Sequence, residues 1–138
     1  MSHAHTLPVP ATAPRRTGRR VLAVLAGLLA NAIPASAIDG VLHATGVYPP
    51  VGQRMSDGLF LLALAYRLVL GVAGTWVTAR LAPDRPMHHA LALGVVGVLL
   101  GTAGTVVMWN AGPVWYPLTL IALTMPCAWL GGRLGTRR

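Results

Sequence analysis

Residues 86–132 read PMHHALALGVVGVLLGTAGTVVMWNAGPVWYPLTLIALTMPCAWLGG and contain no Asp, Glu, Lys or Arg. A helix needs about 20 predominantly apolar residues to cross a membrane, so these 47 residues are enough for two spans. The segment 109–113 combines Asn, Gly and Pro, which is typical of a turn. We therefore predict transmembrane helices over about 89–108 and 114–130.

Two further apolar stretches come before this region, over about 21–47 and 57–81. Segment 48–52 contains Pro-Pro and Gly, which favour a turn between them, and Pro34 is expected to kink the first stretch. None of the stretches has the alternating pattern of membrane β-strands. Because short connections place neighbouring helices antiparallel, the sequence predicts an all-α, integral membrane, four-helix antiparallel bundle. This bundle spans 21–132, between a disordered basic lead over 1–20 and a basic cytoplasmic tail over 133–138.

The composition excludes the main soluble classes. Of 138 residues, 54% are hydrophobic and 10% are charged, whereas an average soluble domain carries about 25% charged residues. A chain of this size has too few charged side chains to cover a water-exposed surface. Nine of the eleven arginines also lie at the ends of apolar segments, and they form no continuous basic face. We therefore expect membrane lipid, and no nucleic acid, around this protein.

Arginine counting predicts the orientation. Nine of the eleven Arg residues lie in the N-terminal lead, the 80–89 region and the C-terminal tail, whereas the opposite connections hold only Arg54. Cytoplasmic segments of membrane proteins are enriched in Arg and Lys. The pattern therefore predicts a multi-pass protein with its N-terminus and its C-terminus in the cytoplasm.

The first apolar stretch has a second interpretation. The arginines of 15–20, the apolar run 21–33 and the sequence Ala35-Ser36-Ala37 also fit a secretory signal peptide that is cleaved after Ala37. Cleavage there would leave three spans that begin at Ile38. Against this interpretation, the weakly polar residues 40–47 are sufficient to continue a first helix outward.

Arg67 is the notable charge inside a predicted span. An Arg at the centre of a membrane helix costs about 2.5–3.5 kcal/mol on insertion scales, so it needs a partner. With a rise of about 1.5 Å per residue, Arg67 lies about 16 Å from the start of its span, and Asp39 lies about 12 Å from the end of the first span. These depths predict an intramembrane ion pair between Asp39 and Arg67.

Three polar residues accompany this pair in the hypothesis. Tyr66 and His43 are candidates to support it by hydrogen bonding, and Asn31 is expected to hydrogen-bond across helices within the first span. The pair is either a structural clamp between two helices or a functional gate or ion-linked site. A third alternative places Asp39 at the outer interface and gives Arg67 another partner.

Small residues form helix-packing seams in two spans. In the third span Gly94, Gly97, Gly101 and Gly104 recur at a period near 3.5, which places them on one helix face. Gly71 and Gly74 share a face of the second span with Arg67. Small residues let membrane helices approach closely. The seams therefore indicate tight packing within the bundle or, alternatively, a homodimer surface.

Several short motifs are similar to those of a known group of proteins. They are the segments DGVLHATGVYPP (39–50), AYR (65–67), ARLAP (79–83) and PCAWLGG (126–132), together with the Gly-Pro-x-Trp-Tyr-Pro pattern of 112–117. With these motifs, residues 21–132 resemble a group of small, uncharacterised four-helix bacterial inner-membrane proteins. The resemblance implies a bacterial inner-membrane location and a retained first helix, and it implies no particular activity.

The sequence contains no signature of an enzyme. It has no phosphate-binding loop, no HExxH, no GxSxG and no Glu, so we predict no catalytic residue, no metal and no cofactor. The function we expect is non-enzymatic, as an interaction or accessory subunit or as a homo-oligomer. The alternative is a small ion- or proton-coupled transporter or channel that uses Asp39.

Overall fold

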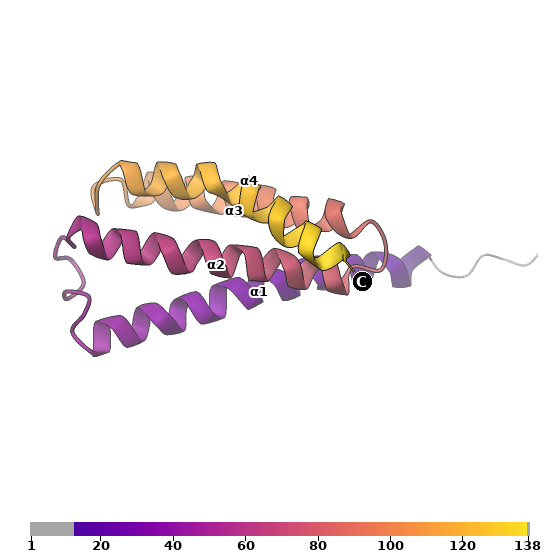
Figure 1. The fold of residues 1–138 in the computed structure, drawn as a ribbon, viewed down its shortest axis with the longest axis horizontal. Coiled ribbons are helices and arrows are strands. Elements are labelled where there is room, and N and C mark those ends of the chain that lie inside the picture. The colour runs from indigo at the N-terminus through magenta and orange to yellow at the C-terminus, as the bar shows by residue number, and fades with distance from the viewer. Residues whose placement is uncertain (1–12, 138) are drawn as a thin grey trace, which may run out of the picture.

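The computed structural model describes residues 13–137 as four α-helices joined by short connections (Figure 1). The helices are α1 (Ala13–Ala44), α2 (Asp57–Leu81), α3 (Pro86–Val107) and α4 (Trp115–Thr136). No β-strand occurs over this range. The predicted all-α four-helix bundle is confirmed.

All four helices are long and apolar enough to cross a membrane. Large apolar side chains cover the outside of the bundle, including Val69, Leu99 and Val106. An apolar surface of this extent is not found on soluble monomers. The helices therefore define the class of protein as a multi-pass membrane protein.

The first helix is shifted relative to its predicted bounds. It begins at Ala13, so residues 13–20 are helical where the sequence predicts disorder, and residues 1–12 lie outside the described range. Ala and Arg are good helix formers that extend a helix already nucleated by the apolar span. The helix ends at Ala44 because Gly46 adopts a φ of 74°, the left-handed conformation that commonly ends helices.

The other helix ends follow local chemistry. Helix α2 begins after Ser56, as expected, although the Ser56 side chain makes no capping hydrogen bond. Helix α3 begins at Pro86 instead of residue 89, because proline is well suited to the first turn of a helix. Helix α4 continues to Thr136, so most of the predicted tail is helical. Neither Pro34 nor Pro126 ends its helix.

Helix α2 occupies the centre of the bundle. It packs extensively against both α1 and α4, whereas α3 contacts the other three helices but touches α1 only slightly. Over residues 13–137, α1 and α4 make no contact with each other. We call the end with the 82–85 connection, Arg20, Arg80 and Arg133 the basic end, and the end with the 45–56 and 108–114 connections the loop end. Helix α1 diverges from α2 toward the loop end (Figure 1).

Glycines allow the helices to touch in the half of the bundle nearest the basic end. A Cβ atom at Gly74 would lie 2.6 Å from the carbonyl oxygen of Gly27, where α1 crosses α2. A Cβ at Gly135 would lie 2.6 Å from the Cβ of Ala79, between α4 and α2. The bundle is therefore closely packed near the basic end and more open toward the loop end.

Candidate functional site

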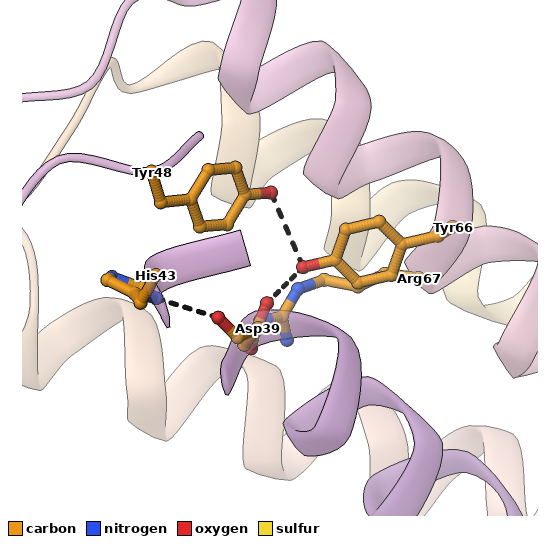
Figure 2. A network of polar contacts seen from close by, with 5 residues as sticks. All are labelled: Asp39, His43, Tyr48, Tyr66 and Arg67. Atoms are coloured by element: carbon orange, nitrogen blue, oxygen red, sulfur yellow. Dashed lines mark hydrogen bonds and ion pairs between the residues drawn. The ribbon is translucent and has the colours of Figure 1, made fainter. Parts of the chain in front are cut away.

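Asp39 of α1 and Arg67 of α2 form an ion pair inside the bundle. The Nη2 atom of Arg67 lies 2.5 Å from Oδ2 of Asp39. The Tyr66 hydroxyl donates a hydrogen bond to Oδ1 of the same carboxylate, and the Tyr48 hydroxyl lies 3.4 Å from that of Tyr66 (Figure 2). The side chains of Arg67 and Asp39 are 34% and 30% exposed, so about two thirds of each side chain is buried in the bundle.

Of the two residues that the sequence suggests beside the pair, Tyr66 donates a hydrogen bond to the Asp39 carboxylate, whereas His43 contacts the backbone of α1. The Nδ1 atom of His43 lies 2.8 Å from the backbone carbonyl oxygen of Asp39, one turn earlier in α1 (Figure 2). The imidazole also packs edge-on against Tyr48 at 5.3 Å between ring centroids. His43 thus contributes to the end of α1 and makes no bond to the charged atoms of the pair.

Both oxygens of the Asp39 carboxylate are engaged by the neighbouring helix. Arg67 uses its donors less completely, because its Nε is buried with no hydrogen-bond partner in the described chain. A single carboxylate on α1 thus links α1 directly to α2.

A cavity of about 380 Å³ lies next to the ion pair, between all four helices. It follows α1 from Leu28 to Asp39 and α2 from Arg67 to Thr75, and residues of α3 and α4 that include Gly97, Ile121 and Cys127 line its other sides. The cavity is partly open at the surface of the bundle, where Ser36 and Leu100 are exposed. The walls are mostly apolar, and the polar groups that reach them include Asn31, Ser36, Asp39 and Arg67. The cavity therefore lies in the middle of the spans, with the charged pair toward the loop end.

Asn31 does not make the interhelical hydrogen bond that the sequence suggests. It lies against Gly74, whose Cβ would be 3.0 Å from the Asn31 Cβ, and its side chain lines the cavity. Within residues 13–137 its amide has no hydrogen-bond partner, and neither does the hydroxyl of Ser36. Two polar groups of α1 therefore reach the cavity without a protein partner.

The glycine seam of α3 packs within the bundle. Cβ atoms at Gly94, Gly97 and Gly101 would lie 2.6, 3.0 and 3.4 Å from Ala128, Thr124 and Ile121 of α4. Gly104 has no side chain within 4 Å. On α2, Gly74 faces α1 and Gly71 makes an ordinary contact with Cys127. Of the two interpretations of the seam, the contacts correspond to packing within one chain.

Sequence reasoning missed a second ion pair at the basic end. Arg20 of α1 donates to both oxygens of Asp84 in the α2–α3 connection, with 3.0 Å between Nε and Oδ1. The Arg20 guanidinium holds the pKa of the Asp84 carboxyl below its ordinary value, first through the hydrogen bond. Asp84 is the only acidic residue at the basic end. Its position among arginines was the feature of the sequence that could have indicated this ion pair.

Residues 13–137 contain no group of three or more side chains suited to hold a metal ion.

Comparison with known proteins finds no relative of this chain. No family model matches the chain, and no curated protein or solved structure matches it. The fold and the cavity with its ion pair therefore define the class, a small four-helix membrane protein with an intramembrane polar site.

Proposed function

We propose that the chain is a non-enzymatic protein of the bacterial inner membrane that acts as an interaction or accessory subunit, with other copies of itself or with another membrane protein. The connections between helices are short, and the described residues include no domain outside the helices. A protein built in this way contacts its partners mainly through its transmembrane surface. The excess of arginine at the basic end supports a cytoplasmic location for both termini.

The observation that carries the proposal is the engagement of the Asp39 carboxylate by Arg67 and Tyr66. A carboxylate that transports protons or cations has to bind and release them during each cycle. Each carboxylate oxygen of Asp39 already accepts a hydrogen bond, one from Tyr66 and one from Arg67, so a cation bound there would have to displace or share these donors. The ion pair therefore supports a structural role for Asp39 more than a role in transport.

A small transporter or channel is the second candidate function, because a transported ion or solute needs a space such as the cavity beside Asp39. Measuring proton and solute flux into liposomes that contain the protein distinguishes a transporter from an interaction subunit. We expect the wild-type protein and the Asp39→Asn variant to show no difference in proton or solute flux. A flux that requires Asp39 would overturn the proposal.

Native mass spectrometry of the gently extracted protein tests the interaction directly. We expect an oligomer of the chain or a complex with a co-extracted subunit, and a chain that is always monomeric and alone contradicts the proposal. The same spectrum gives the mass of the chain. A value of 14.4 kDa indicates a retained first helix, whereas a chain that begins at Ile38 supports the signal peptide.

A further inference from the structure

The cavity between the four helices has the size of a small ligand and not of a partner helix. A helix about 10 Å wide that rises 1.5 Å per residue occupies roughly 120 Å³ per residue. The cavity of about 380 Å³ thus corresponds to less than one helical turn. Ligand pockets in proteins typically measure about 300–1,000 Å³. A small molecule is therefore the occupant that fits this volume.

The outline of the cavity is elongated along the helices. Its wall on α1 runs from Leu28 to Asp39, a distance of about 16 Å at 1.5 Å per residue. A volume of 380 Å³ holds on the order of a dozen groups of the size of a water molecule. These dimensions fit a single chain of about twelve atoms that lies parallel to the helices.

The chemistry of the walls restricts the occupant further. Leu93, Leu100 and Ile121 give it an apolar contact surface, while Asn31 and Ser36 have hydrogen-bonding groups without protein partners. Asp39 and Arg67 neutralise one another, so the site presents no net charge to a ligand. The occupant that matches is apolar along its length, uncharged, and has a group that donates and accepts hydrogen bonds.

Water alone matches these walls less well. A buried water needs two to four polar partners, and the leucines and Ile121 offer none along the apolar side. Water thus satisfies only the part of the cavity near Asn31 and the ion pair. An amphiphilic chain satisfies both parts together.

We propose that the cavity binds a neutral, single-chain lipid-like molecule with a hydroxyl or carbonyl group, and that this polar group bonds to the side-chain amide of Asn31. The site is independent of whether the chain also acts as a subunit of a larger complex. It lies between the helices and reaches the surface at Ser36 and Leu100, and the remaining outer surfaces of α3 and α4 are available to partners.

Cys127 provides a native reporter for this site, because it is the only cysteine of the chain and it lines the cavity. The experiment measures how fast N-ethylmaleimide modifies Cys127 in the full-length protein in phospholipid nanodiscs, with and without dodecanol. At a dodecanol concentration ten times its dissociation constant, we expect the rate to fall by about tenfold. Dodecane lacks the hydroxyl and laurate is charged. For each of them, the factor by which the modification rate of Cys127 falls is expected to be at least about three times smaller than for dodecanol.

Two glycine variants form a matched pair on one helix. In Gly101→Leu the new side chain occupies the cavity that Gly101 lines, so dodecanol should no longer change the rate. In Gly104→Leu the new side chain meets no atom within 4 Å at its Cβ and lies outside the cavity, so protection should equal that of the wild type. A third variant, Asn31→Leu, keeps the branched outline of the side chain but removes its polar atoms, so it should reduce the protection by dodecanol to that by dodecane.

Three results would overturn the proposal. Equal protection by dodecanol and dodecane in the wild type would indicate nonspecific partition into the bilayer. Equal protection in Gly101→Leu and Gly104→Leu would place the ligand elsewhere. A charged, membrane-impermeant thiol reagent that modifies Cys127 as fast as N-ethylmaleimide, with or without dodecanol, would show a water-filled cavity.

Discussion

Gly131 of α4 lies directly over Thr75 of α2, so closely that any Cβ at position 131 would overlap the Thr75 hydroxyl oxygen. The same Cβ would lie 2.9 Å from the backbone nitrogen of Trp76. The Thr75 hydroxyl in turn lies 3.3 Å from the carbonyl oxygen of Cys127 on α4. Helices α2 and α4 therefore meet backbone to backbone, and a hydroxyl group is placed between them.

Replacing Gly131 by Ala is expected to destabilise the bundle by about 1–3 kcal/mol, because backbone atoms of α2 cannot move aside as a flexible side chain can. Gly104→Ala is the matched control, since its Cβ meets nothing within 4 Å. This control should be neutral or stabilise by about 0.5–1 kcal/mol through helix propensity. The measurement is the free energy of unfolding in mixed detergent micelles, and equal effects of the two substitutions would contradict the close contact.

The glycines also illustrate what a sequence can predict. The spacing of Gly94, Gly97 and Gly101 indicates a packing face, and the structure places that face against α4. The spacing does not identify the partner helix, because small residues let any neighbour approach. Gly27 and Gly131 do not belong to the periodic stripes singled out in the sequence, so their close contacts could not be anticipated.

The ion pair could be predicted more fully than the residues around it. A charge in a span requires a partner, and Asp39 is the only carboxylate at a matching depth, so depth arithmetic was sufficient for Asp39 and Arg67. The rotation of α1 about its axis was not available from depth. It determines that Asn31 faces the cavity without a partner, whereas the contact of His43 with the carbonyl one turn earlier is local to α1.

Tyr66→Phe is expected to destabilise the protein by about 1.5–3 kcal/mol, because it removes a hydrogen bond to a charged carboxylate. Tyr48→Phe is the control on the same network. Its hydroxyl lies 3.4 Å from that of Tyr66, a long separation for a strong hydrogen bond, so its loss should cost less. Thermal unfolding of both variants in nanodiscs gives the comparison, and a larger effect at Tyr48 would argue against the network as described.

Asp84 should make stability depend on pH at the basic end. Its pKa lies below the ordinary 3.8 because Arg20 binds the charged form. A carboxyl with a lowered pKa in the folded state stabilises the fold above its ordinary pKa and loses that contribution as the pH falls through the lowered value. Melting curves of the wild type and Asp84→Asn should thus differ most above about pH 5 and converge in acid. A difference that grows toward low pH would contradict this assignment.

The orientation is tested by single cysteines in a Cys127→Ala background. Gln53→Cys lies in the connection at the loop end, and Thr136→Cys lies at the basic end of α4. With both termini in the cytoplasm, an impermeant maleimide added to intact cells should label position 53 and should label position 136 only after the membrane is opened. The reverse pattern would place the termini outside.

The contact between Asp39 and Arg67 is the central claim, and a double-mutant cycle tests it most directly. The free energies of unfolding are measured for the wild type, Asp39→Asn, Arg67→Gln and the double variant. Each single substitution leaves an unpaired charge within the membrane and should cost about 2–3 kcal/mol. The free energy of unfolding of the double variant should then fall by less than the sum of the two single losses, with a coupling energy of roughly 1–3 kcal/mol. Costs that add to within about 0.5 kcal/mol would show that the two side chains do not interact.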